Sequence, residues 1–112
     1  MSRDEVMYLQ DIAQCCEKVL RFTEGLTQTE FIQDQRTYDA VVRNLEIIGE
    51  AAKHLSDRTR RKLPDIEWKK VAGLRDMLAH AYFGIDNDIL WDIIQIRVPC
   101  LSESVDKLLD KG

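Results

Sequence analysis

The chain has 112 residues, of which 45% are hydrophobic, and it carries a formal net charge of -4 with an isoelectric point near 5.1. This length predicts one domain, residues 1–112, with a single core. The acidic charge argues against a protein that coats nucleic acid through net charge alone, so any nucleic-acid contact has to be local.

The sequence gives little support for a membrane protein or for a metal site. No apolar run approaches the roughly 18 residues of a membrane span, and the N-terminus lacks the apolar core of a signal peptide. We therefore expect a cytoplasmic protein that does not enter a membrane. Cys15, Cys16 and Cys100 lack metal-ligand spacing, and adjacent cysteines cannot readily pair within a helix. Buried free thiols are the expectation, with no metal and no cofactor.

Apolar residues at helical spacing run through most of the chain. Residues 4–22 form the first predicted helix, and Gly25 ends it. Thr27 and Glu30 have the pattern of a capping box that opens a short helical turn. Residues 34–55 form a second long helix. Its inward side chains are expected to be Tyr38, Val41, Val42, Leu45, Ile48, Ala52 and Leu55.

The outer side of the second predicted helix is charged. It carries Arg43, Glu46, Glu50 and Lys53 at spacings of three and four residues, which is typical of a solvated face. Gly49 lies in the middle of this helix, where glycine costs about 1 kcal/mol relative to alanine. We interpret Gly49 as the site where another helix approaches closely, from the same chain or from a second subunit.

A basic segment follows, with six basic and two acidic residues between positions 58 and 70. The basic residues are Arg58, Arg60, Arg61, Lys62, Lys69 and Lys70. Such a patch in an acidic protein is a candidate contact for RNA phosphate. An ordinary exposed helix end with cations near its carboxyl terminus explains it equally well.

The remaining chain also has helical patterns. Residues 65–72 predict a short helix that Gly73 ends, and residues 86–109 predict the last helix. Pro99 lies inside this last pattern, so we expect a kink near residues 95–99. Nothing resembles a strand of useful length, and the predicted fold is an all-α bundle.

The stretch from Arg75 to Tyr82 holds most of the polar groups that an active site needs. Asp76 and His80 are four residues apart, so on a helix the carboxylate can orient the imidazole. Arg75 and His80 start roughly 140° apart around the helix axis. They converge only through the long arginine side chain or across a dimer axis. Taken alone, His80 and Tyr82 are more often structural residues, and His54 is expected to be a surface residue without a partner.

These residues resemble a known family. Arg75-x4-His80-x-Tyr82 is similar to the extended R-x4-H-x-Y motif of the HEPN superfamily. The run from Arg43 to Ala52, RNLEIIGEAA, resembles the second-helix signature of its HepT branch, as do Pro64-x3-Trp68 and the triplet LRD at residues 74–76. The resemblance covers nearly the whole chain.

The resemblance implies an antiparallel, homodimeric HEPN bundle that acts as the ribonuclease toxin of a toxin–antitoxin pair. It also implies an antitoxin partner, an MntA-like nucleotidyltransferase that silences the toxin by attaching AMP to Tyr82. Arg75 and His80 are then the catalytic pair. Histidine can serve as base or acid near neutral pH, and arginine can stabilise charge on the phosphate without a metal. The expected products carry 2′,3′-cyclic phosphate and 5′-hydroxyl ends.

One alternative of another class stays open. A HEPN-like helical dimer could be a non-catalytic module that binds nucleotide or RNA and serves as the substrate of its transferase. A metal enzyme is a poor fit, because no histidines and carboxylates have ligand spacing and the HExxH pattern is absent.

Overall fold

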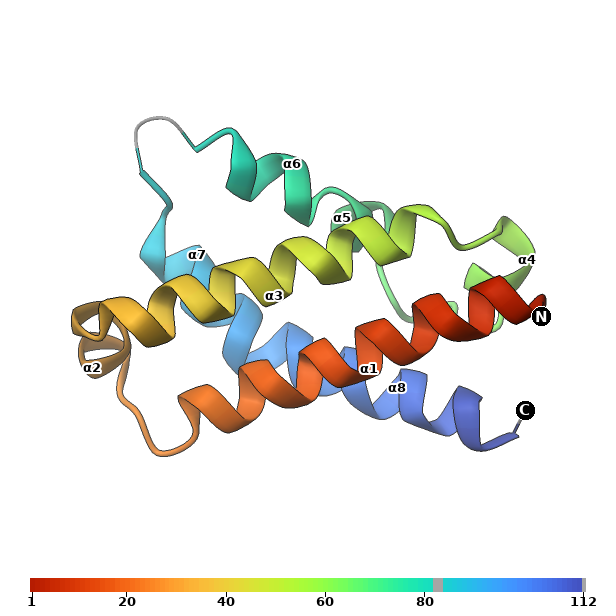
Figure 1. The fold of residues 1–112 in the computed structure, drawn as a ribbon, viewed down its shortest axis with the longest axis horizontal. Helices are drawn as coiled ribbons and strands as arrows, with labels where there is room; N and C mark the ends of the chain where they lie inside the picture. Colours follow the sequence, from red (N-terminus) through yellow and green to blue (C-terminus); the bar gives the residue numbers. More distant parts are fainter. Residues whose placement is uncertain (82–83, 112) are drawn as a thin grey trace.

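The computed structural model describes residues 1–81 and 84–111, and these residues form helices joined by turns and loops (Figure 1). The helices are α1 (Arg3–Thr23), α2 (Gln28–Gln33), α3 (Gln35–Lys53), α4 (Asp57–Arg60), α5 (Trp68–Ala72), α6 (Leu74–Ala79), α7 (Asn87–Asp92), η1 (Ile93–Arg97) and α8 (Val98–Lys111). The predicted all-α fold is confirmed, with no strand among the described residues. No helix in this part of the chain is long and apolar enough to cross a membrane.

Three long helices, α1, α3 and α8, form the body of the molecule (Figure 1). Helix α1 packs against both α3 and α8, whereas the short helices α5 and α6 pack against α3. The side chains between them form one apolar core. Its fully buried members include Leu9, Ile12, Val19, Phe31, Val41, Leu45, Ile48, Leu90, Ile94 and Val105.

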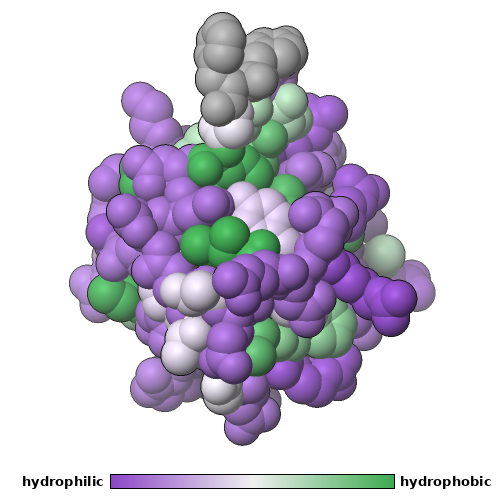
Figure 2. All heavy atoms as spheres, turned by 90° about the vertical axis from the view of Figure 1, so that its left-hand side faces the viewer, coloured by the Kyte–Doolittle hydropathy of each residue, from purple (hydrophilic) through white to green (hydrophobic). Residues whose placement is uncertain are grey.

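The ends of the first helices follow the predicted local signals. Thr27 accepts from the main-chain N–H of Glu30, and the Glu30 carboxylate accepts from that of Thr27, which confirms the predicted capping box. Gly25 has a φ of +78°, a conformation that glycine adopts without steric cost, and it follows the end of α1 as predicted. Figure 2 views the end of the molecule where α2 lies, and hydrophilic side chains cover most of it.

A kink is predicted near Pro99, and the structure has a π-helical turn, η1, directly before α8. Helices α7 and α8 are joined by η1, in which the N–H of Val98 donates to the carbonyl of Ile93, five residues back. Pro99 has no N–H to donate, and its ring would clash with the carbonyl of Gln95 in a regular α-helix. A wider turn just before Pro99 accommodates both constraints.

The prediction of three buried thiols is only partly right. Cys15 and Cys16 are buried, but Cys100 is exposed. Burial raises the pKa of the Cys16 thiol to about 12 and also raises that of Cys15. The apolar spacing of α8 could not distinguish an exposed cysteine from a core one.

A hydrogen bond of Glu5 links α1 to the segment that follows α3. Its carboxylate accepts from the main-chain N–H of Ser56 at 2.6 Å, and Ser56 is the N-cap of α4. The same carboxylate completes the capping box of α1 with Ser2. The hydrogen bond from the Ser56 main chain is the largest cause that lowers the pKa of Glu5, from 4.5 to about 2.

A lowered carboxyl pKa stabilises the fold where the carboxylate is ionised, so this contribution is lost on acidification. We expect wild type to be more stable than Glu5→Gln above pH 4.5, and the difference to shrink as the pH falls toward 2. Urea denaturation across this range measures it. Glu17→Gln, which removes an exposed carboxylate from the same helix, is the control. A pH-independent difference between wild type and Glu5→Gln would contradict the prediction.

Candidate active site

Helix α6, on the outer side of α3 (Figure 1), carries Arg75 and Asp76 of the predicted motif, and His80 caps its carboxyl end. Leu78 is buried and Leu74 is half-buried, four residues apart on the inner side of the helix. Arg75, Asp76 and His80 are all exposed. Helix α6 is thus amphipathic: its leucine side faces the protein, and its polar side chains face the solvent.

Gly49 allows α6 to approach α3 at very short range. A Cβ atom at this position would lie 2.8 Å from the main-chain nitrogen of Arg75 and 3.1 Å from the carbonyl oxygen of Val71. The predicted close approach at Gly49 is confirmed, and the approaching helix belongs to the same chain. The main chain of Arg75 therefore lies against α3 at Gly49, next to the charged side chains of that helix.

Arg75 is held between two carboxylates. Its Nε atom lies 3.5 Å from Oε2 of Glu50, and its Nη1 atom lies 3.6 Å from Oδ1 of Asp76. These distances correspond to ion pairs rather than to short hydrogen bonds. The side chain of Arg75 stays 51% exposed, so a phosphate can reach it from solvent.

Asp76 contacts its neighbours differently from what the sequence predicts. Nζ of Lys53 donates to both carboxylate oxygens of Asp76 at 3.3 Å, and Arg75 pairs with one of them. His80 instead meets the main chain of Asp76. The N–H of His80 donates to that carbonyl oxygen at 3.1 Å, and ring Nδ1 lies 2.9 Å from the same oxygen.

The position of His80 follows from where the helix ends. Helix α6 stops at Ala79, and His80 is its C-cap residue, with a φ of -105° and a ψ of 19°. A carbonyl oxygen only accepts hydrogen bonds, so Nδ1 carries a proton in this contact. In the neutral ring the basic lone pair is then on Nε2, the nitrogen that would act as base or acid. Helix α6 thus ends before Tyr82, and Tyr82 itself lies outside the described residues.

His54 is exposed, as expected of a surface residue, but the expectation that it has no partner is wrong. Its Nε2 atom lies 3.7 Å from Oε1 of Glu50, and its ring stacks on that of Tyr8 with centroids 4.5 Å apart and planes at 10°. The spacing of four residues from Glu50 was visible in the sequence, whereas Tyr8 comes from α1. These residues and Arg75 line a cavity of about 350 Å³. Sequence reasoning missed both Tyr8 and the contact between Glu50 and Arg75.

The six basic candidates for RNA binding do not form one equivalent set. Nη2 of Arg60 donates to the carbonyl of Ala52 at 2.8 Å and its Nε is buried, so Arg60 supports the end of α3. Lys70 pairs with Glu67 at 2.9 Å. The exposed remainder is Arg58, Arg61 and Lys62 around the end of α4, and Lys69 on α5.

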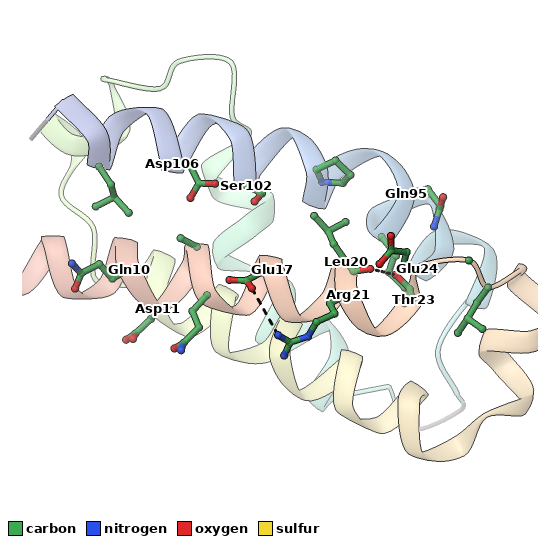
Figure 3. A pocket seen from close by; sticks show the side chains of 17 residues that line it. Gln10, Asp11, Glu17, Leu20, Arg21, Thr23, Glu24, Gln95, Ser102 and Asp106 are labelled. Carbon is green, nitrogen blue, oxygen red and sulfur yellow. Dashed lines mark hydrogen bonds and ion pairs between the residues drawn. The ribbon is translucent and has the colours of Figure 1, made fainter.

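Two other cavities lie at the surface of the bundle. The larger, about 1120 Å³, lies between α1 and the segment from η1 to α8 (Figure 3). Its lining includes the carboxylates of Asp11, Glu17, Glu24 and Asp106 but a single arginine, Arg21, a charge balance that disfavours RNA phosphate. The other, about 480 Å³, is an apolar groove between α6 and η1 where Met77, Ile89 and Ile96 are exposed.

No set of histidine, cysteine and carboxylate side chains able to hold a metal ion occurs among residues 1–81 and 84–111. Among the described residues, the candidate site consists of Arg75, Lys53 and His80 together with the carboxylates of Glu50 and Asp76. Arg75 is a cation that can bind a phosphate, and His80 supplies an imidazole at the end of the same helix.

The site depends on the contact at Gly49, so the variant Gly49→Ala tests the packing. Its added methyl group has to displace main-chain atoms of α6, and we expect a loss of about 1 to 3 kcal/mol in the free energy of unfolding. Gly73→Ala is the matched control, since its Cβ would lie 3.4 Å from the nearest atom, an ordinary contact. Chemical denaturation compares the two. A Gly49→Ala protein as stable as wild type would show that α6 does not pack this closely.

Comparison with known proteins gives consistent matches over nearly the whole chain. The family model described as "Ribonuclease HepT-like" matches residues 12–108. A protein named "Probable ribonuclease HepT" from Thermococcus cleftensis is 41% identical over 108 residues, which are 96% of this chain and 98% of that protein. No solved structure matches.

Two further relatives come from other organisms. A protein of Methanocaldococcus jannaschii named as a candidate RNase is 39% identical, over 96% of this chain and 88% of its own length. A protein of Caldanaerobacter subterraneus subsp. tengcongensis, also named as a candidate RNase, is 40% identical over 93% of each chain.

Proposed function

This chain belongs to the HepT-like ribonuclease family, and we propose that it is a metal-independent endoribonuclease, the toxin of a toxin–antitoxin pair. The observation that carries the proposal is the arrangement on α6. Exposed Arg75 is ion-paired at Nε and Nη1, and His80, at the end of the same helix, has its Nδ1 atom at a main-chain carbonyl. RNA cleavage without metal needs a base, an acid and a cation that stabilises the charge on the phosphate, and an imidazole and a guanidinium can supply these functions.

The chemistry assigns a role to each group. His80 uses Nε2 to take the proton of the 2′-hydroxyl or to give one to the leaving 5′-oxygen, because Nδ1 is committed to the Asp76 carbonyl. Arg75 binds the phosphate and stabilises the negative charge of the pentacoordinate intermediate. The attack of the 2′-oxygen breaks the bond from phosphorus to the 5′-oxygen and leaves a 2′,3′-cyclic phosphate.

A homodimer is part of the proposal. The apolar groove beside α6, with Met77 and Ile96 exposed on its walls, is a suitable surface for a second copy. Two copies joined there would bring two motifs near each other, so that one histidine could act as base and the other as acid. Analytical ultracentrifugation that finds a stable monomer would contradict this part.

RNA would approach α6 over its basic neighbours. Lys69 lies on α5, the helix just before α6, and Arg58, Arg61 and Lys62 extend the positive charge to the end of α4. Each is exposed and can neutralise a backbone phosphate. Arg60 is reassigned to a structural role, because its guanidinium supports the end of α3.

The first test is RNA cleavage in the presence of EDTA. We expect wild type to cut RNA and leave cyclic phosphate ends, and His80→Ala and Arg75→Ala each to lose at least about 100-fold in rate. Circular dichroism checks that both variants keep their helices. Equal cleavage by all three proteins would contradict the assignment. No cleavage by an unmodified wild type would favour the non-catalytic module that binds nucleotide or RNA.

The proposed antitoxin is an MntA-like nucleotidyltransferase that attaches AMP to Tyr82, two residues beyond His80 in the sequence. An added AMP group is bulky and negatively charged, so attaching it close to His80 in the sequence would repel RNA phosphate. We expect Tyr82→Phe to stay toxic when the transferase is co-expressed and to show no added AMP by mass spectrometry. A Tyr82→Phe protein that is still silenced and still modified would show that another residue is the target.

A further inference from the structure

One carboxylate on α3 connects the candidate catalytic arginine to the first helix. Oε2 of Glu50 lies 3.5 Å from Nε of Arg75, and Oε1 of the same side chain lies 3.7 Å from Nε2 of His54. Each oxygen thus faces a different partner. Glu50 is 50% exposed, so its contacts rather than burial decide where its carboxylate lies.

His54 is itself held in place by an aromatic contact. Its ring lies parallel to that of Tyr8 on α1, with centroids 4.5 Å apart. Tyr8 packs against the apolar core, so the stack is anchored in the body of the protein. A continuous series of contacts therefore runs from α1 through His54 and Glu50 to the guanidinium of Arg75.

The second contact of Arg75 completes the arrangement. Its Nη1 atom faces Asp76, whose carboxylate is in turn bound by Lys53 at 3.3 Å. With Nε and Nη1 facing carboxylates, we expect an incoming phosphate to meet Nη2, whose two N–H groups these two contacts leave available. An unrestrained arginine would lose more side-chain entropy on binding that phosphate than one already oriented.

We infer that Glu50, supported by the stacked pair of Tyr8 and His54, is a positioning residue that orients Arg75 for phosphate binding during RNA cleavage. This inference rests on the proposed ribonuclease function. Glu50 does not touch the reacting atoms in this arrangement and acts only through the guanidinium. An exposed ion pair adds little to stability, so the loss of Glu50 should slow cleavage without unfolding the protein.

The neighbouring Glu46 provides a matched control. It lies one turn earlier on α3 and lines the same cavity, but it pairs with Arg43 at 3.6 Å instead of Arg75. Glu46→Gln and Glu50→Gln remove the same charge from the same helix face. Only Glu50→Gln changes the contacts to the proposed catalytic arginine and to His54.

Single-turnover cleavage of an RNA substrate separates the two variants. We expect Glu50→Gln to lower the rate at saturating RNA about tenfold, because a less ordered guanidinium stabilises the charge of the pentacoordinate intermediate less well. The RNA concentration that gives half the maximal rate should change little, because the other backbone phosphates of the RNA contribute most of the binding. Glu46→Gln should behave like wild type, and both variants should melt at the wild-type temperature. Equal loss of rate in both variants would show a general effect of charge in the cavity and overturn the inference.

A second measurement does not depend on ribonuclease activity. The Nε–H signal of Arg75 in a ¹H–¹⁵N spectrum, assigned by its absence in Arg75→Lys, reports the contact directly. We expect Glu50→Gln to shift and broaden this signal and Glu46→Gln to leave it unchanged. An unchanged signal in Glu50→Gln would overturn the inference. If wild type cuts no RNA but the signal responds as expected, the proposed activity fails while the orientation of Arg75 by Glu50 stands.

Discussion

The site depends above all on how closely the backbone of α6 approaches α3. Gly49 has no side chain, and the main-chain nitrogen of Arg75 lies only 2.8 Å from where a Cβ would be. Leu78 closes the contact from the apolar side. Because the motif begins at this point, Glu50 and Lys53 on α3 lie within reach of Arg75 and Asp76. A larger residue at position 49 would push α6 away from α3. Glu50 and Lys53 would then lie farther from Arg75 and Asp76.

The charges around α6 orient side chains rather than hold the helix in place. Their contacts are 3.3 to 3.6 Å long and partly exposed, and pairs of this kind are worth about 0 to 1 kcal/mol each. Packing at Gly49 and Leu78 fixes the backbone, and the ion pairs then select the direction of the guanidinium. His80 is oriented by a third means, the end of the helix, whose Asp76 carbonyl meets its ring.

Local patterns were enough to predict the fold but only part of the site. The capping box at Thr27, the end of α1 near Gly25 and the close approach at Gly49 depend on neighbours in sequence or on the residue itself, and all are confirmed. The stack of Tyr8 on His54 and the pairing of Lys53 with Asp76 join different helices, so helical spacing could not reveal them. The partner of the His80 ring was also missed, because it depends on α6 ending at Ala79.

The three cysteines differ in how readily a thiol reagent can modify them. The pKa of Cys16 is raised to about 12, so near neutral pH almost none of it is in the nucleophilic thiolate form, and Cys15 is buried beside it. Cys100 is exposed and lines the apolar groove next to α6. A thiol-reactive probe would therefore attach at one position without any engineered cysteine. That position lies in the groove proposed to receive the second subunit, so the natural sequence already supplies a reporter for its occupation.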